Sequence, residues 1–302
     1  MSPTRTQIRD SIAVIAANKA SGAAELLSSA AQVFLLLERD ASTPQIIEVC
    51  VGLVRAQPLM APFVSLSNAV ANAIGNNDEL AGEAAANAAA KFDTRVRSAC
   101  HLAVQHAANL IQDESVVLTH SRSSTVLEAI IAASDQGKRV RVIATESRPL
   151  MEGRTLASEL ANRSIEITLI ADAAAGVALE HANLCLLGAD RITPRYVVNK
   201  IGTRMIVLAA VDRAVPAYVV CDESKFTASD EINLLLGEEA GDELWSNPTR
   251  GVRISNLLFE TVELKPFAGV VTERGVLDVA AAKKAAEAQE IHPLLAVALS
   301  NQ

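Results

Sequence analysis

The sequence has few aromatic residues and no excess of positive charge. Only 3% of its 302 residues are Phe, Trp or Tyr, and 35 acidic residues outweigh 27 basic ones, which gives a net charge of -8. A protein that follows a phosphate backbone needs clustered Lys and Arg, and a protein that stacks bases needs aromatic rings. We therefore expect no nucleic acid among the partners of this chain.

Cysteine is scarce, and no two cysteines form a C-x-x-C pair. The four residues are Cys50, Cys100, Cys185 and Cys221, widely spaced and each among apolar neighbours. This pattern supports neither a disulfide framework nor a metal site and is typical of a reducing compartment. The sequence predicts no metal ion and no cofactor.

Long hydrophobic runs are also missing. The longest uninterrupted apolar run has seven residues, Met205 to Val211, whereas a membrane-spanning helix needs roughly 20. No small-residue cleavage site follows the first apolar run, so we see no secretory signal. We expect a cytoplasmic protein without a membrane partner.

Half of the residues are hydrophobic, and most of these are Ala, Val, Leu and Ile, which favour packed helices and parallel strands. The first third of the chain carries helix signals at residues 5–17, 22–38 and 78–112. Another helix is expected from Thr43, as its N-cap, with Pro44 in the first turn. These signals predict an N-terminal helical domain over residues 1–112.

The pattern changes near residue 113. Short β-branched runs then alternate with helix-like segments of ten to fifteen residues; the runs are SVVLT, RVRVIAT, EITLIA, NLCLL and PAYVV. Such alternation is typical of repeated βα units around a mostly parallel sheet. The sequence therefore predicts an α/β protein with a C-terminal Rossmann-like domain over residues 113–302. Such sheets bind ligands outside the carboxyl ends of their strands.

Polar side chains follow each of the five predicted strands. In chain order they are His120, Ser121, Arg122, Ser123 and Ser124; Glu146, Ser147 and Arg148; Asp172; Asp190; and Cys221, Asp222 and Glu223. The run from Ser121 to Ser124 precedes a helix, where unpaired N–H groups and the helix dipole favour an anion. The alternative is that Ser121 or Ser123 only caps the helix. Arg148 could equally lie near a phosphate or be a solvated charge.

Asp190 lies two residues past an apolar strand, and Asn199 and Lys200 follow nine and ten residues later. A carboxylate beside an ammonium and an amide can hold a sugar hydroxyl and move its proton, provided that burial raises the pKa of the carboxylate. The alternative for Asp190 and Lys200 is a structural ion pair.

Five ordered segments carry a resemblance to a known superfamily. They are LTHSRSSTVLEAI, ATESRPLMEGRTLASEL, LIADAAAGVALEHANLCLLGADRI, VVNKIGT and VPAYVVCDESKF. The chain resembles the alpha, beta and delta regulatory subunits of translation initiation factor 2B, ribose-1,5-bisphosphate isomerase and methylthioribose-1-phosphate isomerase over roughly residues 113–277. The resemblance implies a helical N-terminal domain and association through the C-terminal domain, as a homodimer or larger homo-oligomer.

The isomerases of this superfamily convert an aldose 1-phosphate into a ketose with a cysteine acid and an aspartate. By position, the resemblance makes Asp190 the aspartate and makes Asn199 and Lys200 the substrate-contacting pair. Ser121 stands where the isomerases have their cysteine, and a serine hydroxyl is a far weaker acid than a thiol. Our hypothesis is that Cys221, at the end of a neighbouring strand, supplies a thiol instead; the alternative is a buried structural cysteine.

Two functions follow from the resemblance. The first is a sugar-phosphate isomerase-like protein that binds a phosphorylated pentose or a nucleoside monophosphate. In it, His120, Arg122 and Ser123 would contact the substrate, together with Ser124, Glu146 and Arg148. The second is a non-catalytic regulatory subunit that resembles the alpha subunit of the initiation factor. A loop shortened by one residue before Asn199 and the absence of an N-terminal Arg before Gly22 favour the second.

Overall fold

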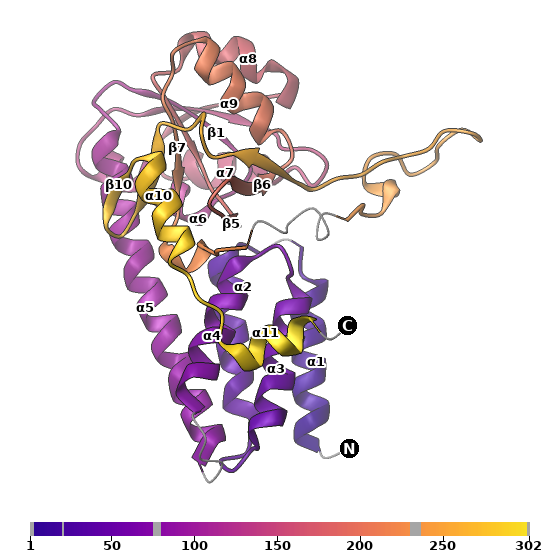
Figure 1. The fold of residues 1–302 in the computed structure, drawn as a ribbon. Helices are drawn as coiled ribbons and strands as arrows, with labels where there is room; N and C mark the ends of the chain where they lie inside the picture. The colour runs from indigo at the N-terminus through magenta and orange to yellow at the C-terminus, as the bar shows by residue number, and fades with distance from the viewer. Residues whose placement is uncertain (1–2, 20, 75–79, 230–236, 301–302) are drawn as a thin grey trace. The chain divides into compact units, whose positions relative to one another are not determined.

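The computed structural model describes residues 3–19, 21–74, 80–229 and 237–300, and the chain divides into two compact units (Figure 1). The helical unit comprises residues 1–98, 224–227 and 288–302, and the sheet unit comprises residues 99–223 and 228–287. The sequence predicted a change of domain after residue 112. The two units meet between Ser98 and Ala99, inside the helix Ala81–Leu110, and the boundary after residue 112 stays a prediction.

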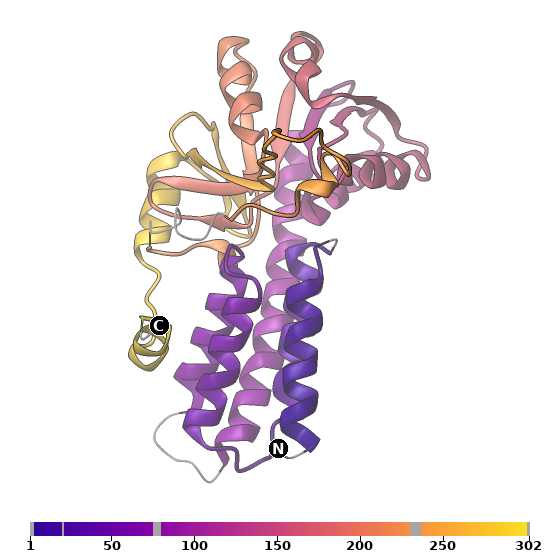
Figure 2. The ribbon, with the colours of Figure 1, turned by 90° about the vertical axis from the view of Figure 1, so that its right-hand side faces the viewer.

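The N-terminal helices of the helical unit run side by side, and its C-terminal helix lies across them (Figure 2). Its elements are α1 (Pro3–Ala17), α2 (Ala23–Val33), η1 (Phe34–Leu36), α3 (Thr43–Ala56), α4 (Ala61–Ile74), the first part of α5 (Ala81–Leu110) and α11 (Pro293–Ser300). These bounds confirm the helices predicted in this part of the chain. The predicted N-cap was wrong by one residue: Ser42 caps α3, and its N–H donates to Gln45 Oε1 at 2.9 Å. Phe34, Phe63 and Leu66 are fully buried in the core of the unit.

The sheet unit contains a seven-stranded sheet in the order β10-β9-β7-β4-β1-β2-β3. All pairs are parallel except β9 with β10. The strands are β1 (Val116–His120), β2 (Arg141–Thr145), β3 (Glu166–Ile170), β4 (Leu184–Leu187), β7 (Ala217–Val220), β9 (Gly269–Thr272) and β10 (Gly275–Leu277). The five predicted strands and the α/β fold class are thus confirmed.

Helices and short turns connect these strands. They are α6 (Ser124–Asp135), α7 (Glu152–Ala161), η3 (Asp172–Ala174), α8 (Ala175–Ala178), η4 (Leu179–His181), α9 (Thr203–Asp212) and η6 (Gly241–Glu243). The turn η5 (Glu223–Lys225) leads from the sheet unit into residues 224–227 of the helical unit, and α10 (Val279–Glu287) follows the last strand. Val117, Ile130, Leu156 and Leu186 are fully buried where helices cover the sheet. None of the helices in the described part of the chain combines the length and the apolar character that a membrane span requires.

A second, three-stranded antiparallel sheet consists of β5 (Arg191–Ile192), β6 (Tyr196–Lys200) and β8 (Phe259–Glu263). The residues before Asn199 were expected to form a loop. They form a strand because Val197 and Val198 pair with Val262 and Thr261, far along the chain, and a remote partner leaves no local signal in the sequence.

The strand order places a switch point between β1 and β4. From β1 the chain builds outward through β2 and β3, and it then returns to place β4 on the other side of β1, with His120 opposite Leu187. In open α/β sheets, ligands bind in the crevice outside the carboxyl ends of the strands at such a point. We therefore expect a ligand to contact the side chains that follow β1 and β4.

Candidate functional site

His120 joins three elements at the carboxyl end of β1. Its side chain is 1% exposed; Nε2 donates to the carbonyl of Ile201 at 2.8 Å, and Nδ1 lies 2.6 Å from Thr145 Oγ1. Because a carbonyl only accepts, the hydrogen is assigned to Nε2, and Nδ1 then accepts from the Thr145 hydroxyl. Burial lowers the pKa of His120, so the ring is neutral near pH 7. Both nitrogens are occupied, and the ring ties β1 and β2 to the turn after β6.

The loop after β1 is tied to the loop after β2 by Ser147. The Ser121 N–H donates to Ser147 Oγ at 2.7 Å, and Ser147 is fully buried. The carboxylate of Asp172 accepts the N–H groups of Ser147 and Arg148, both at 2.7 Å. Ser121, Ser147 and Met151 all have φ between 60 and 64°. Such left-handed non-glycine residues cost energy and cluster at functional sites.

Lys200 and Glu152 form a buried ion pair near His120. Lys200 Nζ lies 2.7 Å from Glu152 Oε1, and the two side chains are 3% and 19% exposed. Glu152 is the first residue of α7, and Gly153 lets this helix approach β2: a Cβ at residue 153 would lie 1.8 Å from the carbonyl oxygen of Thr145. The other carboxylate oxygen, Glu152 Oε2, is buried and has no hydrogen-bond partner among the residues that the structure describes.

The start of α6 lies beside the end of β4. Ser123 is the N-cap of α6, and its Oγ accepts from the N–H of Val126 at 3.4 Å, as the capping interpretation predicts; Ser124 is the first helical residue. Gly188 packs on this cap, since a Cβ at residue 188 would lie 2.8 Å from Ser123 Cβ. Asp190, two residues on, is half-buried, and its N–H donates to the carbonyl of Val198 at 2.9 Å.

Three predicted side chains bond to neighbours rather than to the cluster around His120. The guanidinium of Arg122 makes two hydrogen bonds, of 2.9 and 2.8 Å, to the carboxylate of Glu159. Glu146 Oε2 accepts from Arg154 Nη2 at 2.8 Å, and Asn199 Nδ2 donates to Thr203 Oγ1 at 2.9 Å.

For two further predicted residues, the hydrogen bonds that hold them come from their backbone N–H groups. The Arg148 N–H is held by Asp172, and the residue is half-buried. Cys221 is fully buried, and its N–H donates to the carbonyl of Val271 at 3.0 Å. Burial alone gives Cys221 the features of a structural cysteine, so its role as an acid stays a hypothesis.

The residues that join the site most tightly were not among the predicted site residues. Thr145, which ends β2, and Glu152 had no local signal, since their roles depend on how α7 meets β2. Ser147 was visible only as one more hydroxyl after the second strand. In the described ranges, no group of three or more His, Cys, Asp or Glu side chains is arranged to hold a metal ion.

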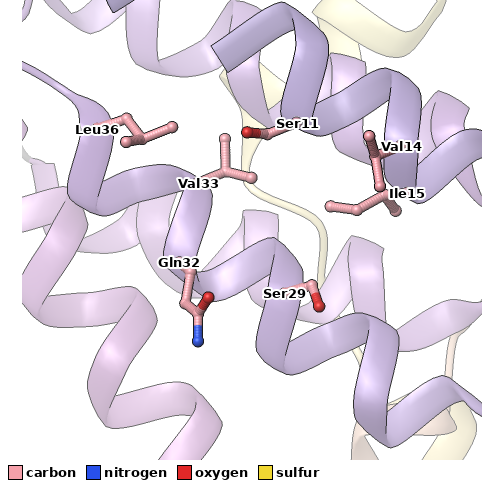
Figure 3. Close-up of a pocket in the computed structure, with 7 residues that line it drawn as sticks. All are labelled: Ser11, Val14, Ile15, Ser29, Gln32, Val33 and Leu36. Atoms are coloured by element: carbon pink, nitrogen blue, oxygen red, sulfur yellow. The ribbon is translucent and has the colours of Figure 1, made fainter. Parts of the chain in front are cut away.

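Two hollows in the helical unit contain none of the predicted residues. The smaller, of about 330 Å³, lies between α1 and α2 (Figure 3). The larger, of about 910 Å³, lies between α1 and α3. The smaller is lined by Ser11, Val14, Ile15, Ser29, Gln32, Val33 and Leu36. Its lining carries no charged side chain, so it offers nothing that would select a phosphorylated ligand.

Comparison with known proteins identifies the family of the chain. The chain is 36% identical over 261 residues to a Pyrococcus horikoshii protein described as translation initiation factor eIF-2B subunit 2-like, which covers 85% of this chain and 91% of that protein. It is 30% identical over 265 residues to the ribose 1,5-bisphosphate isomerase of Archaeoglobus fulgidus, with 85% of each chain covered. The crystal structure of the Pyrococcus horikoshii OT3 translation initiation factor eIF-2B superposes with a TM-score of 0.80 at 33% identity, over 90% of this chain and 97% of that one. The model of the initiation factor 2 subunit family matches residues 13–279, and the chain belongs to this family.

Proposed function

We propose that this chain is a sugar-phosphate isomerase-like protein that binds a phosphorylated pentose or a nucleoside monophosphate at the carboxyl ends of β1, β2 and β4. The observation that carries the proposal is the convergence of three elements on His120, with the buried Lys200–Glu152 pair beside it. The position at the switch point of the sheet supports it. The identity to a relative named ribose 1,5-bisphosphate isomerase supports the class of ligand.

In this proposal the phosphate lies at the start of α6, where the first N–H groups of the helix have no partner within it. Gly188 keeps the end of β4 close to Ser123 without a side chain between them. Asp190 and Lys200 would face the sugar hydroxyls. Conversion of an aldose 1-phosphate to the ketose breaks the bond between C1 and the ring oxygen and moves one hydrogen from C2 to C1. The proton of the O2 hydroxyl moves to the ring oxygen and O1 keeps its phosphate, so the conversion requires no external oxidant.

The second candidate is a non-catalytic regulatory subunit, and Ser121 favours it. A hydroxyl stands where the resemblance places an acidic thiol, and the Ser121 N–H is bonded to Ser147 Oγ. In this case the same site binds the ligand without converting it, and the main task is assembly with other subunits. We also propose a homodimer or larger homo-oligomer, which multi-angle light scattering tests directly; a monomer at micromolar concentration would refute it.

The test has two stages. A thermal-shift screen of ribose 1-phosphate, ribose 5-phosphate, ribose 1,5-bisphosphate, AMP and inorganic phosphate measures binding. A ligand at 100 times its Kd should add about 2.7 kcal/mol of stability. The ligands that bind are then followed by NMR for conversion, with the wild type and with Asp190→Asn. Conversion by the wild type that is lost in Asp190→Asn supports the isomerase, binding without conversion supports the regulatory subunit, and no binding refutes the proposal.

A further inference from the structure

The Lys200 ammonium and the Glu152 carboxylate form an ion pair inside the protein. Nζ and Oε1 are 2.7 Å apart, and only 3% of the Lys200 side chain is exposed. A buried pair of this kind forms at the expense of hydration and persists only with good geometry. The ammonium is therefore largely neutralised before any ligand arrives.

Both ends of the pair are held by the backbone. Glu152 begins α7, which approaches the end of β2 so closely that only a glycine fits at residue 153. Lys200 ends β6, and the carbonyl of the next residue, Ile201, accepts from the buried ring of His120. The pair is thus a fixed part of the strand-end cluster and not a contact between mobile surface side chains.

The buried ring of His120 does not replace the positive charge that Glu152 neutralises. His120 carries none near pH 7, because burial lowers its pKa. The carboxylate of Asp172 accepts two backbone N–H groups. What the pair leaves open is Glu152 Oε2, a buried acceptor without a hydrogen-bond donor in the described part of the chain. A buried acceptor is stabilised by a donor such as a hydroxyl, and it repels a phosphate.

We propose that Glu152 is a specificity-determining residue. By neutralising Lys200 it makes this part of the site accept a sugar hydroxyl and reject a second phosphate. Resting on the proposed function, the inference narrows the ligand to a pentose that carries a single phosphate. Lys200 then orients hydroxyl groups together with Glu152 and does not bind phosphate.

Isothermal titration calorimetry with ribose 5-phosphate and ribose 1,5-bisphosphate tests this inference. We expect the wild type to bind the monophosphate at least tenfold more tightly. Glu152→Gln keeps the shape of the side chain, removes its charge and frees the ammonium, so the affinity for the bisphosphate relative to the monophosphate should rise at least tenfold. The matched control is Glu180→Gln, which removes a carboxylate from an exposed pair with Arg213 in the same unit and should leave the ratio unchanged.

Two more variants separate charge from general damage. In the double variant Glu152→Gln with Lys200→Gln, the ammonium is gone, and the gain for the bisphosphate should disappear. In Lys200→Gln alone, the Glu152 carboxylate is unpaired, and the relative affinity for the bisphosphate should fall below that of the wild type; this variant decides the matter if Glu152→Gln does not fold. An unchanged ratio in either single variant overturns the inference while leaving the proposed function standing. A wild type that binds neither sugar phosphate overturns both.

Discussion

Gly153 controls how closely α7 approaches β2, and replacing it by alanine should destabilise the sheet unit. The new Cβ would lie 1.8 Å from the carbonyl oxygen of Thr145, whereas real Cβ atoms essentially never come closer than 3.0 Å. The helix start must therefore retreat by at least about 1.2 Å. The obstacle is backbone, which cannot rotate away as a side chain can. Overpacking of this kind costs about 1–3 kcal/mol, and we expect about 2–3 kcal/mol here.

Urea unfolding followed by circular dichroism measures this cost. The matched control is Gly176→Ala in α8, where the nearest atom to the new Cβ is Ala209 Cβ at 3.9 Å, so this variant should be neutral or slightly more stable than the wild type. Since the retreat of α7 moves Glu152 away from Lys200, Gly153→Ala should also bind ribose 5-phosphate more weakly. Surface substitutions usually change stability by no more than about 0.5 kcal/mol. A difference of that size or less between Gly153→Ala and Gly176→Ala would contradict the close approach of α7 to β2.

Three further outcomes follow from groups that are buried or half-buried. Burial lowers the pKa of His120 below its usual 6.5. As the pH falls below 6.5, the unfolded chain therefore takes up a proton that the folded chain does not. The free energy of unfolding then falls by up to about 1.4 kcal/mol per pH unit. His120→Asn should show a shallower dependence in urea titrations between pH 6.5 and 5, and equal slopes would contradict this. Burial, and then the charges of Asp222 and Glu223, raise the pKa of Glu273. Glu273→Gln should therefore raise the thermal midpoint at pH 7.5, and this gain should be lost below about pH 4.5. A lower midpoint at pH 7.5 would refute this. Cys221→Ser places a hydroxyl at a fully buried position and should lower the free energy of unfolding by about 1–3 kcal/mol. The ligand affinity measured by calorimetry should change less than twofold. Any conversion activity that survives unchanged eliminates Cys221 as the acid.

The strands of the parallel sheet and most helices could be predicted because each has a characteristic pattern of residues within its own segment. The run SVVLT and the four that follow it are apolar, β-branched and bounded by polar residues, and all five became strands of the parallel sheet. β6 escaped the same analysis although it contains Val197 and Val198, because its partner β8 begins about sixty residues later. The position of the predicted site followed from the rule that parallel strands present their carboxyl ends at one edge.

The sequence alone determined that helices precede a parallel α/β sheet and that polar side chains follow the ends of its strands. Only the tertiary structure decided which of those side chains meet. Lys200 pairs with Glu152, 48 positions away, and Arg122 with Glu159, 37 away. Periodicity is a property averaged over one segment, whereas an ion pair requires two atoms within about 4 Å. That distance depends on how separate elements pack, here on the absence of a single Cβ at Gly153.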